Sequence, residues 1–337
     1  MNLNEVLRAP WLAVGRPILK AAGFEIARGA QPSVDGALHA AHDEVRNAKL
    51  ATLMAEHAIA GEKLVRLISV SARERGELAA WIQAKRRHSN TLPEGFPGIA
   101  DDSELPPFTA STPTSLGAVE LGRGLAAAFT AVRTYQDRVE ISADKLIPGA
   151  NEGYEKIYAT KQVFWQTFDS IWLVPGRNYV ALISDLPLKV PSGFTRASQQ
   201  FLEAQVRQVL NRHVRCVNIW TAVEGLYRAE EGRLVDHGFV NNAEAVKSHT
   251  ARRGGSSLRD DPYDVAGAEA VGEDLRTYRV AIAWKRGPDG GVTSRPEVSL
   301  PGTSRELHKN SLDHFIFRNG LNSGDLEFVV SKVLAHI

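Results

Sequence analysis

Two strand–turn–strand patterns constrain the fold of this 337-residue chain more than any other feature of its sequence. Residues 157–174 are crowded with aromatic and β-branched side chains, a Pro-Gly-Arg-Asn turn occupies 175–178, and residues 179–183 return as a second strand. Dry and wet side chains alternate over 278–285 and again over 292–300, on either side of a glycine-rich turn. Hairpins of this kind pair antiparallel, so we predict an α+β fold in the C-terminal part.

The first ninety residues predict a compact α/β unit. Apolar residues recur at helical spacing over 34–45, and the short β-branched segment 63–70 is typical of a strand. Ser71 stands three residues before Glu74, which is the spacing of a capping box at a helix start. We therefore expect a strand–helix pair over 63–88.

A proline-rich stretch over 89–116 separates this unit from the rest of the chain. Five prolines mixed with Gly, Ser and Thr cannot sustain a helix or a central strand. We interpret the stretch as an interdomain linker or a long ordered loop. The predicted organisation is an N-terminal α/β domain at 1–88, the linker, and a strand-rich α+β domain at 117–337 that ends in a helix.

Further elements are predicted inside the C-terminal domain. An apolar stripe over 201–210 predicts a helix, and residues 226–240 read as a hairpin that turns at 230–232. Pro296 implies that its strand lies at a sheet edge, because proline cannot donate to a strand partner. Thr303 and Glu306 offer a second capping box, and apolar residues over 326–334 predict the terminal helix.

Composition narrows the class of protein. Hydrophobic residues make up 43% and charged residues 23%, the mixture of an ordinary globular protein. Lys and Arg number 40 against 39 Asp and Glu, and a net charge of +1 argues against a dedicated polybasic binder. The single cysteine, Cys216, excludes an intrachain disulfide and a thiolate metal cluster. Charges interrupt the N-terminal segment, and no apolar run reaches the length of a membrane span, so we expect a cytoplasmic protein without membrane contact.

Familiar catalytic motifs are missing from the sequence. It contains no P-loop, no nucleophile elbow, no kinase motif set and no His-Glu-x-x-His. No motif is specific enough to indicate a family. The sequence therefore identifies no catalytic residue, predicts no cofactor and no metal site, and leaves open whether the chain is an enzyme.

Two local patterns have a functional and a plainer reading. His39 and His42 are three apart on a predicted helix, a spacing that suits a metal, although solvated helix histidines look the same. Cys216 near His213 suggests a nucleophile and its base, but sequence neighbours rarely point at each other, so a buried structural thiol is favoured.

Three further groups of residues are more simply explained by structure than by function. The basic run 85–88 is expected to complement the carbonyl end of its helix rather than bind phosphate. Asp261 ahead of Pro262 favours a helix N-cap over a nuclease-type carboxylate site, for which the candidate partners are Asp260, Asp264, Asp169, Asp185 and Glu297. The aromatic residues Trp165, Trp172, Tyr158 and Tyr179 are expected in the sheet core, and would stack on bases only if they face solvent.

The segment from 247 to 263 carries the strongest functional pattern. We expect a helix to begin near 241–242 and to stop at the glycine pair 254–255. Glycines let backbone amides approach an anion, hydroxyls add donors, and guanidinium groups suit phosphate oxygens. The candidate ligand-binding residues are Lys247, His249, Arg252, Arg253, Ser256, Ser257 and Arg259.

Three functions remain open from the sequence. The leading hypothesis is a cytoplasmic module that binds nucleic acid or another phosphate-bearing ligand, as one subunit of a larger complex. The second is a metal-dependent nuclease or another enzyme that acts on a phosphorylated substrate. The third is a protein-interaction subunit without a ligand, for which an edge strand and the C-terminal helix offer docking surfaces.

Overall fold

The structure of the chain is a computed structural model. It describes residues 6, 9–40, 43–85, 105, 112–142, 147, 153–186, 192–241, 246–251, 256–289 and 292–337, without the side chains of residues 273, 288, 289 and 292.

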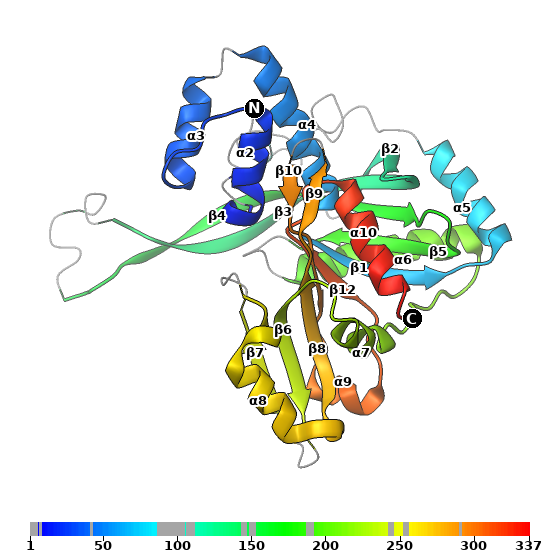
Figure 1. Cartoon of the computed structure of the whole chain (residues 1–337). Coiled ribbons are helices and arrows are strands. Elements are labelled where there is room, and N and C mark those ends of the chain that lie inside the picture. Colours follow the sequence, from blue (N-terminus) through cyan, green and yellow to red (C-terminus); the bar gives the residue numbers. More distant parts are fainter. Residues whose placement is uncertain are drawn as a thin grey trace.

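Ten strands form one sheet in which every neighbouring pair is antiparallel (Figure 1). In order across the sheet they are β2 (Thr114–Leu121), β3 (Gly124–Glu140), β4 (Tyr158–Leu173), β5 (Tyr179–Asp185), β1 (Lys63–Ser69), β12 (Phe315–Arg318), β11 (Glu297–Leu300), β8 (Arg276–Ala283), β6 (Arg233–Val240) and β7 (Val246–Thr250). A separate pair joins β9 (Arg286–Asp289) to β10 (Val292–Ser294). The sheet and its helices confirm the predicted α+β class.

Helices cover both faces of this sheet and build a separate N-terminal cluster. They are α2 (Arg16–Ala22), α3 (Ala30–His39), α4 (Glu44–Ala60), α5 (Ala72–Ala84), α6 (Ser192–Leu210), α7 (Thr221–Arg228), α8 (Pro262–Val271), α9 (Ser304–Lys309) and α10 (Ser323–Leu334). A short π-helix, η1 (Trp11–Gly15), and two short 3-10 helices, η4 (Leu258–Asp260) and η5 (Gly272–Asp274), accompany them. None of the described helices has both the length and the apolar composition that a bilayer span requires.

Alternation along the central strands divides the core into two layers. In β1, Val65 and Leu67 pack with α7 and α10, whereas Ile68 packs with α5 and α6 on the opposite face. In β5, Ala181 and Ile183 face α7 and α10, and the neighbouring residues face the other layer. Both strands are buried on both sides because successive side chains point to opposite faces.

The strand of the N-terminal unit lies in the middle of the sheet. Strand β1 pairs along its whole length with β5, and its other edge pairs with β12. A strand from the middle of the chain and a strand near its C-terminal end therefore enclose it. The division into domains at 1–88, 89–116 and 117–337 stays a prediction, and most of the proline-rich stretch lies outside the described residues.

Several local signals act as expected. Ser71 and Glu74 form the capping box of α5, and Thr303 and Glu306 form that of α9, each with both reciprocal hydrogen bonds. The hairpin of β4 and β5, the helix α6 and the terminal helix α10 also confirm the predictions.

Two predicted elements are wrong in type. The expected hairpin over 226–240 is helix α7 followed by β6, because Ala222, Val223 and Leu226 form a buried helical stripe. The helix expected after 241–242 is instead strand β7, which pairs with the outer edge of β6.

Two predicted boundaries also differ. Helical spacing over 34–45 belongs to two helices, and Leu38 and Val45 are exposed. Pro296 does not mark a sheet edge, because β11 lies between β8 and β12. The proline precedes β11, where its carbonyl accepts a hydrogen bond from the Trp284 amide at 3.0 Å and no amide hydrogen is needed.

A buried ion pair connects β1, β4 and β5. Lys63 and Asp185 are register partners, and the Lys63 ammonium is fully buried against the Asp185 carboxylate. Lys63 Nζ also donates to the carbonyls of Ala58 at 2.7 Å and Phe168 at 3.0 Å, while the Phe168 amide donates to Asp185 Oδ2 at 2.7 Å. Each charged group therefore has hydrogen-bonding partners besides its counter-ion, as burial of a charge requires.

We expect Lys63→Met to lower the free energy of unfolding by about 3–5 kcal/mol, because it leaves Asp185 buried without its counter-ion. The measurement is urea unfolding followed by circular dichroism. The control is Arg73→Met, which removes an exposed pair with Glu77 and should cost less than about 1 kcal/mol. Equal losses in the two variants would contradict this account of the buried pair.

Candidate nucleic-acid interface

Five of the seven predicted ligand-binding residues belong to the described chain. Lys247 and His249 lie on β7, Ser256 and Ser257 precede η4, and Arg259 lies within it. Arg252 and Arg253 lie outside the described residues, as do the two glycines between the arginines and the serines.

Lys247 and His249 point to the same face of β7 because they are two residues apart. Their register partners on β6 are Phe239 and His237. The carboxylate of Asp264, on helix α8, lies between the two histidines, with Oδ2 3.2 Å from His237 Nδ1 and Oδ1 3.3 Å from His249 Nδ1. The carboxylate thus joins α8 to β6 and β7. His249, a predicted ligand-binding residue, is already paired with it.

Ser257 and Arg259 hold their own loop in place. The Ser257 hydroxyl accepts hydrogen bonds from the Arg259 amide at 3.2 Å and from the Leu234 amide at 3.1 Å. The Arg259 guanidinium donates to the Tyr227 carbonyl at 2.7 Å and lies 5.3 Å from the centre of the Tyr227 ring. These contacts give both residues a structural role, and the anion-binding role of the segment stays a prediction.

The residues considered for a metal site are distributed over several elements. His39 lies at the end of α3, and His42 is outside the described residues. Asp261 caps α8 by accepting hydrogen bonds from the amides of Tyr263 and Asp264, with Pro262 at the first helical position, as the simpler reading of this sequence predicts. In the described part of the chain, no three His, Cys, Asp or Glu side chains gather to hold a metal ion.

Cys216 is partly buried beside β1, where it forms an isolated bridge with Ile68. Burial raises the pKa of its thiol to about 11, and this effect outweighs the nearby Arg66 guanidinium, which lowers it. A thiol with a raised pKa is a poor nucleophile near neutral pH. The geometry therefore favours the structural reading of Cys216.

Two carboxylates, Asp169 and Glu297, are buried within the sheet, and a third, Glu62, is largely buried just before β1. Asp169 Oδ1 accepts a hydrogen bond from the Asp185 amide at 3.0 Å, and burial raises the pKa of Asp169. Glu62 Oε1 accepts from the Asn319 amide at 2.6 Å, and burial raises the pKa of Glu62 to about 7. Glu297 is buried on β11. These carboxylates serve the packing of the sheet, where backbone amides hold two of them.

Strands β3 and β4 continue beyond the sheet as a two-stranded projection, which we name the ribbon (Figure 1). Pairing of β2 with β3 ends at Thr130, and pairing of β5 with β4 ends at Ser170. The ten register pairs from Ala131↔Thr167 to Glu140↔Tyr158 follow. At about 3.3 Å per residue, they span roughly 30 Å.

The outer part of the ribbon begins at the pair Thr134↔Phe164, beyond which no residue of either strand is buried. Directly opposite residues share a face, and the faces alternate along each strand. One face, which turns with the twist of the ribbon, therefore carries polar and aromatic side chains: Thr134, Gln136, Arg138, Glu140, Tyr158, Thr160, Gln162 and Phe164.

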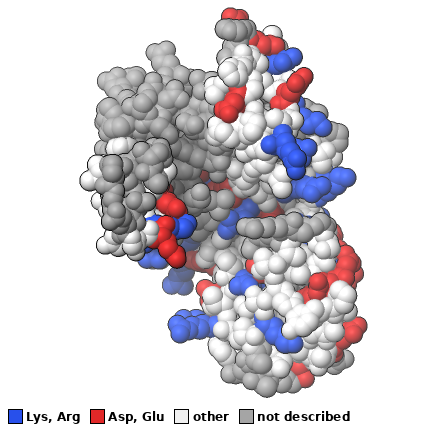
Figure 2. Space-filling model, turned by 90° about the vertical axis from the view of Figure 1, so that its left-hand side faces the viewer, with Lys and Arg blue, Asp and Glu red and all other residues white. Residues whose placement is uncertain are grey.

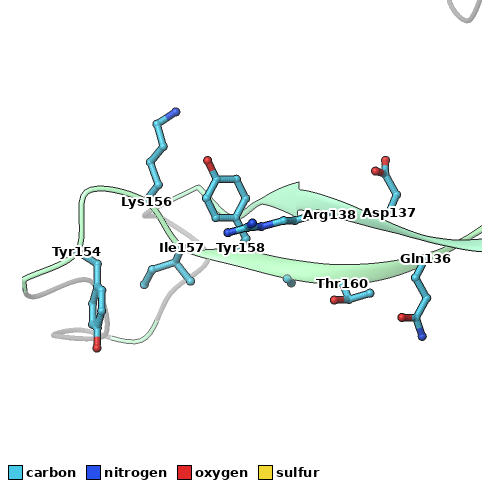
Figure 3. Close-up of a pocket in the computed structure, with 9 residues that line it drawn as sticks. Gln136, Asp137, Arg138, Tyr154, Lys156, Ile157, Tyr158 and Thr160 are labelled. Carbon is cyan, nitrogen blue, oxygen red and sulfur yellow. The ribbon is translucent and has the colours of Figure 1, made fainter. Parts of the chain in front are cut away.

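A cavity of about 580 Å³ lies along this outer ribbon (Figure 3). Its lining includes Gln136, Arg138, Tyr154, Tyr158 and Thr160. The Arg138 guanidinium lies against the Tyr158 ring, 4.1 Å from its centre. Tyr154 is 69% exposed and Tyr158 is 41% exposed. The cavity thus offers a stacked cation and two accessible aromatic rings.

Charge on the outer ribbon is balanced. The described residues 134–142 and 153–165 contain the cations Arg138, Lys156 and Lys161 and the carboxylates Asp137, Glu140 and Glu155. Lys156 Nζ donates to Glu140 at 2.8 Å, whereas among the described residues Arg138 has no carboxylate partner. Basic and acidic side chains are also interspersed on the face from which the ribbon projects (Figure 2).

Strand β4 is predicted from the sequence, but the ribbon is not. Tyr158, Trp165, Trp172 and Tyr179 were expected in the core. Trp172 is buried there, but Tyr158 lies on the exposed ribbon. One available signal was the length of the strands, because β3 has 17 residues and β4 has 16, far more than a typical sheet strand. The second was the polar alternation over 134–140.

Comparison with family models, with curated proteins and with solved structures finds no match to this chain.

We expect Cys216 in the folded protein to react with iodoacetamide at pH 8 about 100-fold more slowly than in the urea-unfolded chain. Raising the thiol pKa from 9.0 to about 11 lowers the thiolate fraction by that factor. Mass spectrometry of quenched time points gives both rates. Equal rates in the folded and unfolded states would contradict the raised pKa and make Cys216 a candidate nucleophile again.

The raised pKa of Glu62 predicts a pH-dependent effect of Glu62→Gln. Because the folded protein binds this proton more tightly than the unfolded chain does, the wild type loses stability as pH rises from about 4.5 to about 7. The glutamine variant lacks this loss, so its stability relative to wild type should rise over this window by up to roughly 3 kcal/mol. Urea unfolding at pH 5 and pH 8 measures the change, and a constant difference would contradict it.

Proposed function

We propose that this chain binds nucleic acid, and that the outer ribbon is its contact surface. The observation that carries the proposal is the Arg138–Tyr158 contact in a cavity whose lining also includes the exposed Tyr154 ring. Aromatic rings stack on bases, and an arginine in contact with such a ring adds a cation and a fork of hydrogen-bond donors.

Unengaged polar groups on the same face support a nucleic-acid ligand over an apolar one. The side chains of Gln136, Thr160 and Gln162 have no hydrogen-bond partner among the described residues, and each offers a donor and an acceptor. Base edges present matched donors and acceptors, whereas an apolar partner surface would leave these groups desolvated and unpaired.

The balanced charge of the ribbon sets the expected strength of binding. Only Arg138 and Lys161 are cations without a carboxylate partner among the described residues of the outer ribbon, so few phosphates are neutralised. We therefore propose moderate affinity with a shallow salt dependence, at a slope of about −2 in a plot of log affinity against log salt.

Other parts of the proposal extend the sequence hypotheses. The Lys247–Arg259 segment supplies a second phosphate contact, for which the exposed Lys247 is the described candidate. We also propose that the protein is cytoplasmic and that it is one subunit of a larger complex. A metal-dependent nuclease is less well supported, because Asp261 and Asp264 already serve as a helix cap and a histidine partner.

We expect Arg138→Ala to weaken nucleic-acid binding about 5- to 150-fold, because it removes the stacked cation and its donors. Fluorescence anisotropy with labelled mixed-sequence DNA and RNA, single- and double-stranded, measures the affinity. Arg73→Ala, an exposed arginine on α5, is the matched control and should bind as wild type.

Two results would overturn the proposal. The first is that wild type binds none of these nucleic acids in low salt. The second is that Arg138→Ala binds as wild type while Arg252→Ala with Arg253→Ala loses affinity, which would move the interface to the Lys247–Arg259 segment.

A further inference from the structure

We infer that the ribbon reads base edges in the major groove of double-stranded DNA, an inference that rests on the proposed nucleic-acid function. The major groove of B-form DNA, about 12 Å wide and 8.5 Å deep, admits a two-stranded antiparallel ribbon. The outer ribbon consists of two strands without flanking strands over the seven pairs from Thr134↔Phe164 to Glu140↔Tyr158. It therefore has the cross-section that such a groove accepts.

Side-chain types on the exposed face match the hydrogen-bonding code of this groove. Arginine contacts guanine through O6 and N7, glutamine contacts adenine through N6 and N7, and threonine contacts any base or the thymine methyl group. Arg138 and Thr160 are directly opposite each other, and Gln136 and Gln162 form the next pair on the same face. The face thus carries four base-reading side chains in two adjacent rows.

Spacing along the ribbon also suits stacked base pairs. Rows on one face are two residues apart, or about 6.7 Å. Base pairs rise 3.4 Å each, so the two rows lie about two base-pair steps apart. The Arg138 row and the Gln136–Gln162 row can accordingly address two positions of one short site.

Contact with Tyr158 restrains the Arg138 side chain before it binds a ligand. The guanidinium carbon lies over the tyrosine ring, 4.1 Å from its centre, and among the described residues no carboxylate occupies the guanidinium N–H groups. An arginine restrained by such a contact loses less conformational entropy on binding than a free one. Tyr158 therefore acts as a positioning residue for Arg138. Tyr158→Ala should weaken DNA binding, whereas Tyr158→Phe, which keeps the ring, should bind as wild type.

Balanced charge strengthens the case for base readout over backbone binding. A surface that held DNA through phosphates alone would carry an excess of cations, which the described outer ribbon lacks. Base readout predicts that duplex RNA binds more weakly than duplex DNA, because the major groove of RNA is too deep and narrow for side chains to read.

The experiment selects sites from a randomised duplex DNA library and then replaces guanine by 7-deazaguanine in the enriched duplex. We expect an enriched short motif, at least tenfold weaker binding to duplex RNA of the same sequence, and about 5- to 150-fold weaker binding when the guanine read by Arg138 loses N7. Arg138→Ala should be insensitive to this replacement. Gln162→Ala should relax the motif at one other position, while Gln208→Ala, an exposed glutamine on α6, should leave it unchanged.

The outcomes separate this inference from the function on which it rests. Binding without an enriched motif, equal binding of duplex RNA, tighter binding of single-stranded DNA, or an equal 7-deazaguanine effect in wild type and Arg138→Ala would each overturn groove readout and leave nucleic-acid binding standing. Absence of binding to any nucleic acid would overturn both.

Discussion

The buried pair of Lys63 and Asp185 is the interaction on which the arrangement of the sheet depends. It joins register partners on β1 and β5, and it binds both backbone groups of Phe168 on β4. A shift of β1 by one residue would carry Lys63 to the opposite face and leave the aspartate unpaired, so the pair helps to specify the register. It also ties the N-terminal strand to the C-terminal sheet.

The same pair marks the point where the ribbon leaves the sheet. Strand β4 pairs with β5 only as far as Ser170, and at Phe168 the side chains of Lys63 and Asp185 take the place of the missing strand partner. Buried backbone groups need such partners, because unpaired ones are costly. The ribbon is therefore anchored at its base by a fixed buried contact, which suits an element that presents side chains to a ligand.

The side chains of β3 and β4 change from apolar to polar where the two strands leave the sheet. Inside the sheet, Phe129, Ile171 and Leu173 pack against α5 and α6, whereas the outer ribbon carries Gln136 and Arg138. One continuous pair of strands thus provides both a hydrophobic core and an exposed polar face.

Local features of the fold were predictable from the sequence, and non-local ones were not. The strand at 63–69, the capping boxes and the β4–β5 hairpin depend on residues that are close together in the chain. Strand β7 was mistaken for a helix because its pairing with β6 decides its conformation, and short polar segments carry little signal of their own. The central place of β1 depends on partners more than 100 residues away, such as Asp185, whose position the sequence does not reveal.

The candidate site shows the same limit. His249 was identified by its basic neighbours, but its carboxylate partner Asp264 reaches it from helix α8. Tyr158 and Trp172 lie in one strand with similar neighbours, yet one is exposed on the ribbon and the other is buried in the core. Which aromatic ring is accessible depends on where the sheet ends, and only the assembled sheet determines that.

Hydrogen–deuterium exchange of the chain with and without bound duplex DNA tests the central claim, that the ribbon is the contact surface, most directly. The account predicts slower amide exchange over residues 134–142 and 153–165 in the complex, weaker protection over 246–259, where Lys247 makes the second phosphate contact, and no change in α5. Protection confined to 246–259, with the ribbon unchanged, would contradict it.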